Sequence, residues 1–521
     1  MILRSFIFLV FAFGLIFSSA CRNRSGTGDS VTVALPEKFT SLDTLTSKAS
    51  DAAAERVRNL MFNSLVKKDE KFDYVGDLAE QINTSEDGKI ITFVLRDNVK
   101  FHNGKTLTSA DVKYTFDEMF KSGSNKSNSF FETVEGARVP HITSIDTPDA
   151  KTVSFTISRP SLKNQLLPNL VPIPIIAEGT ISQQAAQPVG TGAFKFAGFD
   201  QSQNIVELTA NPDYWEGAPK VQKIRVKTVT DAGSLQAELQ SGGVDLAPLP
   251  NNLPPDTLKS LGQNPKLEVK QFEGSNIDYL GLNTQAPPLD NVKIRQAIAY
   301  AVNREQIINE LLSGQAVIAN SILPVSSWAY NDNVVKYSYN PERAKQLVRE
   351  AGYKNEPIKF KFSVGNTAVN QYAQVIQRSL QDVGLNVEIE TLEPNTLRSQ
   401  LTSGQFQMNT GRWIGGNQDP IFLRDLFATS KIPTAAGGGF NRSRYSNPEY
   451  DKIIEEAFNL TDRDRAKALY FKAQEIAAND VPMIPLWYPA NMSVSNRRVG
   501  NIKIGASGDF SFIKDITIEG Q

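Results

Sequence analysis

The chain has 521 residues, and its 55 Lys and Arg side chains nearly balance its 56 Asp and Glu side chains. Single hydrophobic cores stop growing at about 250–300 residues, so two or more lobes are expected. The near-neutral balance offers no single-sign field for binding nucleic acid, and a content of one Cys and two His excludes a disulfide framework and a Cys/His zinc site.

The N-terminal residues predict an export signal over residues 1–20. A positive start precedes an almost wholly apolar stretch over residues 5–17, and the small residues Ser18-Ser19-Ala20 follow. This stretch is too short to span a bilayer permanently; the alternative is a buried N-terminal helix. Cys21 comes next, which resembles a bacterial lipobox with Ser18 in place of the usual Leu. The resemblance implies a lipid on Cys21 and a polar tether over 21–30.

The first third of the body alternates strand and helix patterns. Apolar residues recur at every second position over 31–35, over 91–95 after a hairpin-type Asp-Gly turn, and over 153–157. Thr108 with Asp111 three residues later is typical of a capping box, so a helix is predicted from Thr108.

The second half of the chain is more helical. Helices are predicted from Asp290, from Asn340-Pro341 to Gly352, around Tyr372 as far as Gly384, from Asn447-Pro448, and over 466–476, with a strand over 385–389. This mixture predicts an α/β fold with mixed sheets and flanking helices. Pro and Gly do not gather in one long linker, so short crossings are expected between the lobes.

Short motifs favour structural roles over catalysis. Gly190-Thr191-Gly192 lacks a third glycine and a following helix, so it predicts a tight turn into a hairpin, not a nucleotide loop. His102 beside a turn is typical of a hydrogen-bonding structural residue. The glycines over 437–439 fit a mobile rim loop or an ordinary surface loop equally well. The sequence contains no G-x-S-x-G elbow, P-loop or H-E-x-x-H motif, and so gives no reason to choose an enzyme.

Longer sequence blocks follow one another along the chain. They are Leu78–Glu80, Leu95–Gly104, Thr106–Val112, Pro188–Phe194, Asn211–Trp215, Leu239–Asp245, Leu280–Asn283, Val292–Ala301, Ala351–Tyr353, Tyr445–Asp451 and Val481–Leu486. Together, in this order, they closely resemble the extracytoplasmic solute-binding proteins for dipeptides, oligopeptides, nickel and related ligands. The resemblance extends from about residue 31 to about residue 500.

This resemblance implies a two-lobed fold of the periplasmic-binding-protein type, type II, with an extra inserted domain. The lobes would be joined by two crossing strands and would close around the ligand. The implied boundaries are 31–62, 188–271 and 487–521 for a discontinuous lobe I, 63–187 for the inserted domain, and 272–486 for lobe II.

The resemblance also implies a receptor of an ABC import system. It would capture a peptide-like or other small polar solute and deliver it to a permease with ATPase subunits, on the periplasmic or cell-surface face of a membrane to which its lipid anchors it. We expect a monomer, not an enzyme, with no cofactor, no metal and no nucleic-acid partner. The alternatives are a stand-alone ligand sensor, a chaperone-like binding lipoprotein, or a secreted hydrolase.

The ligand-binding segment of the peptide-binding members resembles residues 412–420. Trp413 and the terminal Asp419-Pro420 match, whereas the Asp that grips a peptide ammonium falls on Gly416 and a Gly is replaced by Arg412. Trp413 is the leading candidate for ligand contact, with core packing as the alternative. Asn417 is a candidate hydrogen-bonding residue. Asp419 is either a substitute for the missing carboxylate or a turn-forming residue before Pro.

Further candidates lie outside this segment. Arg442 and Arg444 flank a segment that lies near the cleft in relatives, and Tyr488 is expected near the hinge. A lost carboxylate and added arginines favour an anionic or sugar-like ligand, although surface arginines explain the same pattern. A bare nickel ion is not expected with two His and no free thiol.

Overall fold

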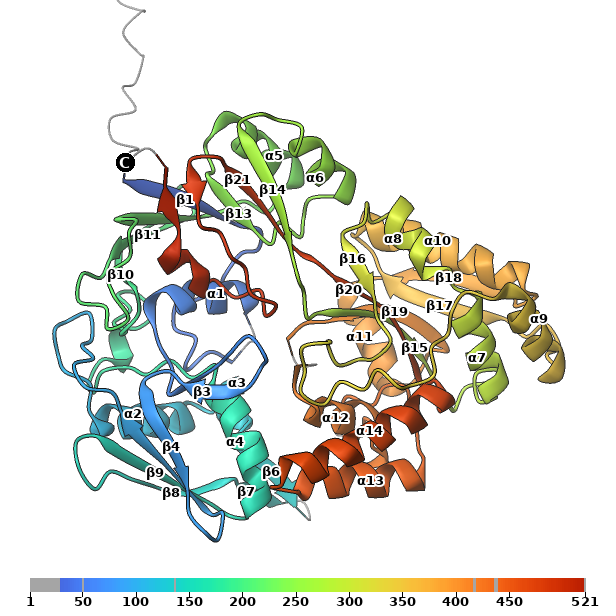
Figure 1. The fold of residues 1–521 in the computed structure, drawn as a ribbon, viewed down its shortest axis with the longest axis horizontal. Helices are drawn as coiled ribbons and strands as arrows, with labels where there is room; N and C mark the ends of the chain where they lie inside the picture. Colours follow the sequence, from blue (N-terminus) through green and yellow to red (C-terminus); the bar gives the residue numbers. More distant parts are fainter. Residues whose placement is uncertain (1–28, 49–50, 135–136, 416–417, 435–438, 520–521) are drawn as a thin grey trace, which may run out of the picture.

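The computed structural model describes residues 29–48, 51–134, 137–415, 418–434 and 439–519. Three parts form a ring: lobe I at the upper left of Figure 1, an insert at the lower left, and lobe II on the right. The predicted α/β fold with mixed sheets is confirmed. The export signal and Cys21 lie outside the described residues.

Lobe I is built on a seven-stranded sheet. In spatial order its strands are β10 (Phe194–Asp200), β11 (Ile205–Ala210), β12 (Lys223–Thr228), β1 (Ser30–Leu35), β13 (Leu246–Pro248), β21 (Asn491–Asn496) and β14 (Leu267–Phe272). Its other elements are α1 (Ala52–Met61), α5 (Ala232–Ser241), α6 (Pro255–Leu261), β22 (Val499–Gly500) and β23 (Thr517–Ile518). β1 pairs in parallel with strands on both sides, and its residues 31–35 are all buried, so both faces of this strand are covered.

The insert is built on a four-stranded antiparallel sheet. Its strands are β4 (Ala79–Thr84), β5 (Ile90–Leu95), β9 (Thr152–Ile157) and β8 (Ile142–Asp146), and its other elements are β2 (Val66–Lys68), β3 (Tyr74–Gly76), β6 (Phe131–Val134), β7 (Ala137–Pro140), α2 (Ser109–Ser122), α3 (Asn125–Asn128) and α4 (Lys163–Leu170). The predicted capping box at the start of α2 is confirmed, because the Thr108 N–H donates to Asp111 over 2.9 Å.

Lobe II is built on a six-stranded mixed sheet. In spatial order its strands are β16 (Ala316–Ile318), β20 (Met483–Pro489), β15 (Ile277–Leu282), β19 (Met408–Trp413), β17 (Ile358–Ser363) and β18 (Val387–Leu392). Its helices are α7 (Val292–Ala301), α8 (Arg304–Glu310), α9 (Pro341–Glu350), α10 (Thr367–Asp382), α11 (Pro394–Ser403), α12 (Ile421–Phe427), α13 (Pro448–Asn459) and α14 (Arg463–Asp480). The predicted cap of α7 at Asp290 was wrong: the neighbouring Asn291 has the extended backbone of a cap, and its side chain accepts the Lys293 N–H.

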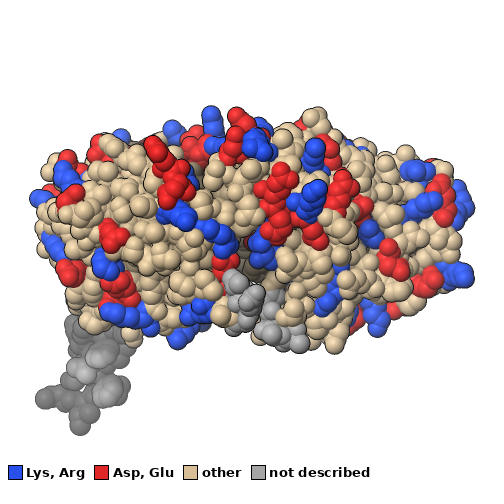
Figure 2. All heavy atoms as spheres, turned by 90° about the horizontal axis from the view of Figure 1, so that it is seen from below, with Lys and Arg blue, Asp and Glu red and all other residues tan. Residues whose placement is uncertain are grey.

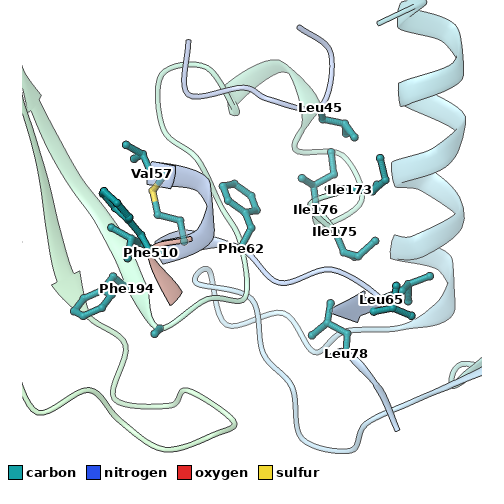
Figure 3. Close-up of a cluster of buried hydrophobic side chains, with 14 of the residues drawn as sticks. Leu45, Val57, Phe62, Leu65, Leu78, Ile173, Ile175, Ile176, Phe194 and Phe510 are labelled. Carbon is teal, nitrogen blue, oxygen red and sulfur yellow. The ribbon is translucent and has the colours of Figure 1, made fainter. Parts of the chain in front are cut away.

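Lobe I and the insert share one continuous hydrophobic core, whereas lobe II has cores of its own. Figure 3 shows the junction: Phe194 and Phe510 of lobe I lie on one side of Phe62, and Ile175 and Leu78 of the insert lie on the other. Because close-packed apolar side chains resist relative displacement, lobe I and the insert form one rigid unit.

Two short chain crossings join lobe I to lobe II. One leads from β14 to β15 and the other from β20 to β21. They approach each other closely at Gly274, where a Cβ would collide with the Pro489 carbonyl oxygen. Glycine is required here by proximity of the two backbones, not by an unusual dihedral angle.

The Gly-Thr-Gly motif and His102 meet at the junction between lobe I and the insert. As predicted, the motif precedes the β10–β11 hairpin, and a Cβ on Gly190 or Gly192 would collide with the backbone of Met61. The Gly190 N–H donates to Nδ1 of His102 over 3.3 Å, and Nε2 donates to the Gly192 carbonyl over 3.0 Å. The predicted structural role of His102 is confirmed.

The stability of this junction depends on pH. Burial lowers the pKa of His102 from 6.5 to about 4, although the hydrogen bond to Gly192 opposes the shift. Between these values the unfolded chain binds more protons than the folded one, so stability falls as the pH is lowered through this window. From pH 7 to pH 5 we expect His102 to contribute a loss of about 1–2 kcal/mol in the free energy of unfolding, measured by urea denaturation.

The His102→Gln variant isolates this contribution from that of the carboxyl groups. The variant is expected to be less stable at pH 7 but to lose less stability than the wild type between pH 7 and pH 5. Equal losses in the two proteins would contradict the assignment.

Candidate functional site

Trp413 is the last residue of β19, an inner strand of the lobe II sheet. It lies at the end of the sheet where the chain enters from lobe I. It lies opposite Ile277, the first residue of β15. Its indole stacks on Tyr279 with ring centres 6.2 Å apart, and Phe422 and Phe440 contact it edge-on at 5.1 and 5.8 Å. β17 runs parallel to both β18 and β19, so Trp413 lies at the carboxyl end of parallel strands, the usual place for a ligand in α/β sheets.

Arg412 forms a two-pronged ion pair with Asp278. Its Nε and Nη2 donate to the two carboxylate oxygens over 2.6 and 2.8 Å, and the Trp487 Nε1 donates to the same carboxylate over 2.7 Å. The Asp278 side chain is 4% exposed and that of Arg412 is 40% exposed. Burial opposes the charge of Arg412, but the Asp278 carboxylate outweighs this effect and raises the pKa of Arg412. The guanidinium charge is therefore neutralised within lobe II.

Sequence reasoning did not identify Asp278 as part of this site. The only local signal is a carboxylate at the second position of β15, a strand that is otherwise apolar apart from Tyr279 and Gly281. A buried acid in such a strand requires a partner, but the partners are 134 and 209 residues away.

Asp419 connects lobe II to the insert. One carboxylate oxygen accepts the hydroxyl hydrogen of Tyr74 over 2.6 Å, and the other accepts the N–H of Ile421 over 3.0 Å. Burial and the nearby Asp419 charge raise the pKa of Tyr74, which therefore stays protonated as the donor. Both oxygens of Asp419 have protein partners, and the bond to Ile421 is that of a turn-forming Asp.

Gln418 reinforces the same contact. Its Oε1 accepts from Lys68 Nζ over 2.9 Å, and its Nε2 donates to Ser275 over 2.8 Å. Burial lowers the pKa of Lys68, although Asp419 opposes the shift. One side chain thus contacts both the insert and the crossing between the lobes.

A second group of polar contacts joins the insert to lobe II at α13 and α14. Arg463 forms an ion pair with Asp73, and the Asn164 side chain donates to the carbonyls of Phe458 and Leu460 over 3.0 and 3.1 Å. Figure 1 shows α4 next to α13 at the bottom of the ring. These contacts close the ring without joining the two cores.

A hollow of 1630 Å³ lies among the three parts. Its walls include residues 58–77 of lobe I and the insert, residues 214–220 and 501–515 of lobe I, and Gln418 of lobe II. Binding sites for drug-sized molecules occupy about 300–1,000 Å³, so this space accommodates a peptide-sized solute with bound water.

Several charged groups on the wall formed by lobe I and the insert neutralise one another. Lys67 lies 2.8 Å from Glu216 and 3.9 Å from Asp77, and Lys514 lies 3.4 Å from Glu216. Burial raises the pKa of Asp77, an effect that Lys67 opposes. On the face seen in Figure 2, basic and acidic side chains are also interspersed. The wall therefore offers polar groups of both signs.

The remaining predicted residues are placed as follows. Arg444 donates from Nη2 to the Thr402 carbonyl over 3.1 Å. Tyr488 is buried, with its hydroxyl 2.6 Å from the carbonyls of Ser321 and Leu323, so it donates to one of them at a time. Gly416 and Asn417 lie outside the described residues, as do Gly437 and Gly438 of the glycine run.

The described part of the chain lacks two kinds of feature. Within it, His, Cys, Asp and Glu side chains form no group of three or more that could hold a metal ion. No helix there combines the length and the apolar character needed to cross a membrane.

Residues 73–434 match the family described as bacterial extracellular solute-binding proteins, family 5 Middle. Heme-binding protein A of Haemophilus influenzae is 30% identical over 468 residues, covering 84% of this chain and 83% of that protein. The dipeptide-binding protein of Escherichia coli is 28% identical over 488 residues, covering 88% and 89%. The solved structure of HbpA2 from Haemophilus parasuis has a TM-score of 0.78 at 26% identity, covering 94% of this chain and 100% of that one.

The Arg412–Asp278 pair provides a test of the site's architecture. Asp278→Asn removes the buried carboxylate that Arg412 and Trp487 both bond, so we expect a loss of about 1.5–3 kcal/mol in the free energy of unfolding, measured by urea denaturation. The matched control is Asp382→Asn, which breaks an exposed pair with Arg378 on α10 and should cost less than about 1 kcal/mol. Similar losses in both variants would show that the Asp278 carboxylate contributes no more to stability than an exposed one.

Proposed function

Since the chain belongs to the family 5 bacterial extracellular solute-binding proteins, it is an extracytoplasmic solute receptor, and we propose that it holds a peptide-like or other small polar solute between its lobes for delivery to an ABC permease. The observation that carries this proposal is the 1630 Å³ hollow, which is lined by lobe I and the insert and meets the separately packed lobe II at Gln418. The relatives are named for different ligands, heme and dipeptides among them, so membership of the family does not fix the solute.

Closure of lobe II onto the insert is the proposed capture step. Hydrogen bonds join them, such as Tyr74 with Asp419 and Lys68 with Gln418, and bonds of this kind can form and break without opening a hydrophobic core. A solute drives closure only through contacts that are better in the closed state. Trp413 and Asp419 fit this role. Trp413 provides an aromatic ring on which a solute can rest, called the ligand platform below, and Asp419 contacts the insert.

The solute is proposed to leave the protein chemically unchanged. Both ring nitrogens of His102 are engaged by backbone groups, so this imidazole is not available as a general base. The competing hydrolase hypothesis predicts that a bound compound is consumed.

Native mass spectrometry of protein purified without denaturation tests the proposal. We expect a retained solute whose mass stays constant over hours. The Tyr74→Phe variant should bind this solute more weakly, because it loses one hydrogen bond made across the closed cleft. The affinity should fall by about 3–10-fold, as measured by calorimetry with the recovered solute.

The matched control is Tyr330→Phe, which removes an exposed hydrogen bond to Asp332 and should leave the affinity unchanged. A protein that neither retains nor binds a solute, or that degrades it, would refute the proposed function. Equal affinities for Tyr74→Phe and the wild type would refute the role of this contact in closure.

Membrane anchoring through a lipid on Cys21 completes the proposal. It is supported by the apolar stretch and the small residues before this cysteine. Cys21→Ser should move the exported protein from the membrane fraction to the soluble fraction, as measured by fractionation and immunoblotting. A variant that remains fully membrane-bound would contradict lipid anchoring.

A further inference from the structure

Arg442 differs from three other arginines of lobe II because its side chain lacks a hydrogen-bond or ion-pair partner among the described residues. Arg412 has Asp278, Arg424 has Glu455, and Arg304 donates to three backbone carbonyls. For Arg442, no carboxylate lies within 4 Å and no acceptor bonds its side chain among the described residues, and its Nε is fully buried without a partner. A partly buried guanidinium lacking any counter-charge is costly, so a missing anionic partner is indicated.

The position of Arg442 is fixed by its two neighbours. The buried Asn441 side chain bonds the backbone of Ala428 and Tyr445 over 2.8–3.1 Å, and the Ser443 carbonyl accepts from the Thr284 N–H over 2.8 Å. The backbone at Arg442 is therefore fixed by the loop, so a ligand would have to order only the side chain, which lowers the entropic cost of binding.

Arg442 lies over the proposed ligand platform. Its guanidinium carbon is 5.6 Å from the centre of the Trp413 ring, and the Trp413 Nε1 is also buried without a hydrogen-bond partner. Two neighbouring side chains thus carry N–H groups that no described residue satisfies. Donors alone at this position favour a ligand that supplies acceptors.

Asp278 and Asp419, two carboxylates of the described residues near this platform, are not free to receive an ammonium group. Both oxygens of Asp278 are taken by Arg412 and Trp487, and both oxygens of Asp419 are taken by Tyr74 and Ile421. These two acids are therefore committed to the protein itself.

Apolar side chains exposed next to the platform add a second element of recognition. Ile414, which follows Trp413 directly, is 68% exposed, and Phe440, which contacts the Trp413 ring, is 47% exposed. Exposed large apolar side chains beside unsatisfied donors are typical of a binding site for a molecule with an apolar and a polar end.

We propose that Arg442 binds an anionic group of the transported solute, a carboxylate or a phosphate, while Trp413, Phe440 and Ile414 contact an apolar portion, and that a free ammonium group is not required. This inference rests on the proposed receptor function and specifies its ligand class.

Four small probes, added to protein stripped of retained solute by reversible unfolding, separate the chemistries. N-acetylphenylalanine carries a carboxylate without an ammonium, N-acetylphenylalaninamide is its neutral counterpart, phenylalaninamide carries an ammonium alone, and phenyl phosphate carries a phosphate. We expect at least one anionic probe to bind about 10–100-fold more tightly than the neutral and cationic probes, as measured by calorimetry and Trp fluorescence. The tighter of the two anionic probes identifies the source of the charge.

The Arg442→Gln variant should lose this preference, whereas Arg378→Gln, on the exposed face of α10, should keep it. Trp413→Phe, which removes the indole N–H but keeps an aromatic ring, should weaken anionic binding by about 3–10-fold and confirms the site if Arg442→Gln fails to fold. Equal binding of the acetylated acid and its amide, or an anion preference that persists in Arg442→Gln, would overturn the proposal.

The retained solute distinguishes this proposal from the receptor function. If the wild type releases an anionic solute on denaturation, both stand. If it releases a neutral or cationic solute, the role of Arg442 is refuted and the receptor function survives. If it retains nothing and binds none of the probes, both are refuted.

Discussion

Apolar packing joins lobe I to the insert, whereas the contacts described above between the insert and lobe II are hydrogen bonds and an ion pair. The shared core around Phe62 makes the first junction rigid, while Tyr74–Asp419 and Arg463–Asp73 are the kind of contact that water can replace at little cost. This difference determines which parts of the molecule move together. The hollow meets lobe II at Gln418, so in the proposed mechanism closure of lobe II onto the insert would also cover a captured solute.

Much of the fold could be predicted because its signals are local. Asn340-Pro341 and Asn447-Pro448 begin α9 and α13 as expected. In each case the Asn side chain accepts a backbone N–H of the first turn, and the Pro that follows has the backbone angle of a first helical residue. The capping box at Thr108 and the hairpin after Gly192 are equally short-range. The cap of α7 was misplaced by one residue because adjacent Asp and Asn have the same capping chemistry, and only the backbone angles distinguish them.

The chemistry of the site could not be predicted in the same way, because its partners are far apart along the chain. Arg412 was expected to contact a ligand. In the structure its guanidinium Nε and Nη2 donate to Asp278, 134 residues away. Asp419 reaches Tyr74 across 345 residues. Composition and periodicity contain no information about such pairs. The choice of Trp413 rested on resemblance, and its unsatisfied indole N–H became visible only with the surrounding side chains in place.

The close approach of Gly274 to the Pro489 carbonyl has a mechanical consequence. The two connectors lie side by side here, between the paired residues Phe272 and Asn491 on one side and Asp278 and Trp487 on the other. In the proposed closure, lobe II is therefore expected to rotate about this region and not to slide along lobe I. The angle between the two lobes in the absence of solute then depends on how closely the two connectors pack. Gly274 does not line the hollow. A methyl group at this position would nevertheless push the two connectors apart and change the equilibrium between open and closed conformations. The affinity of such a receptor for its solute can thus be changed at the hinge, without any change in the residues that contact the solute.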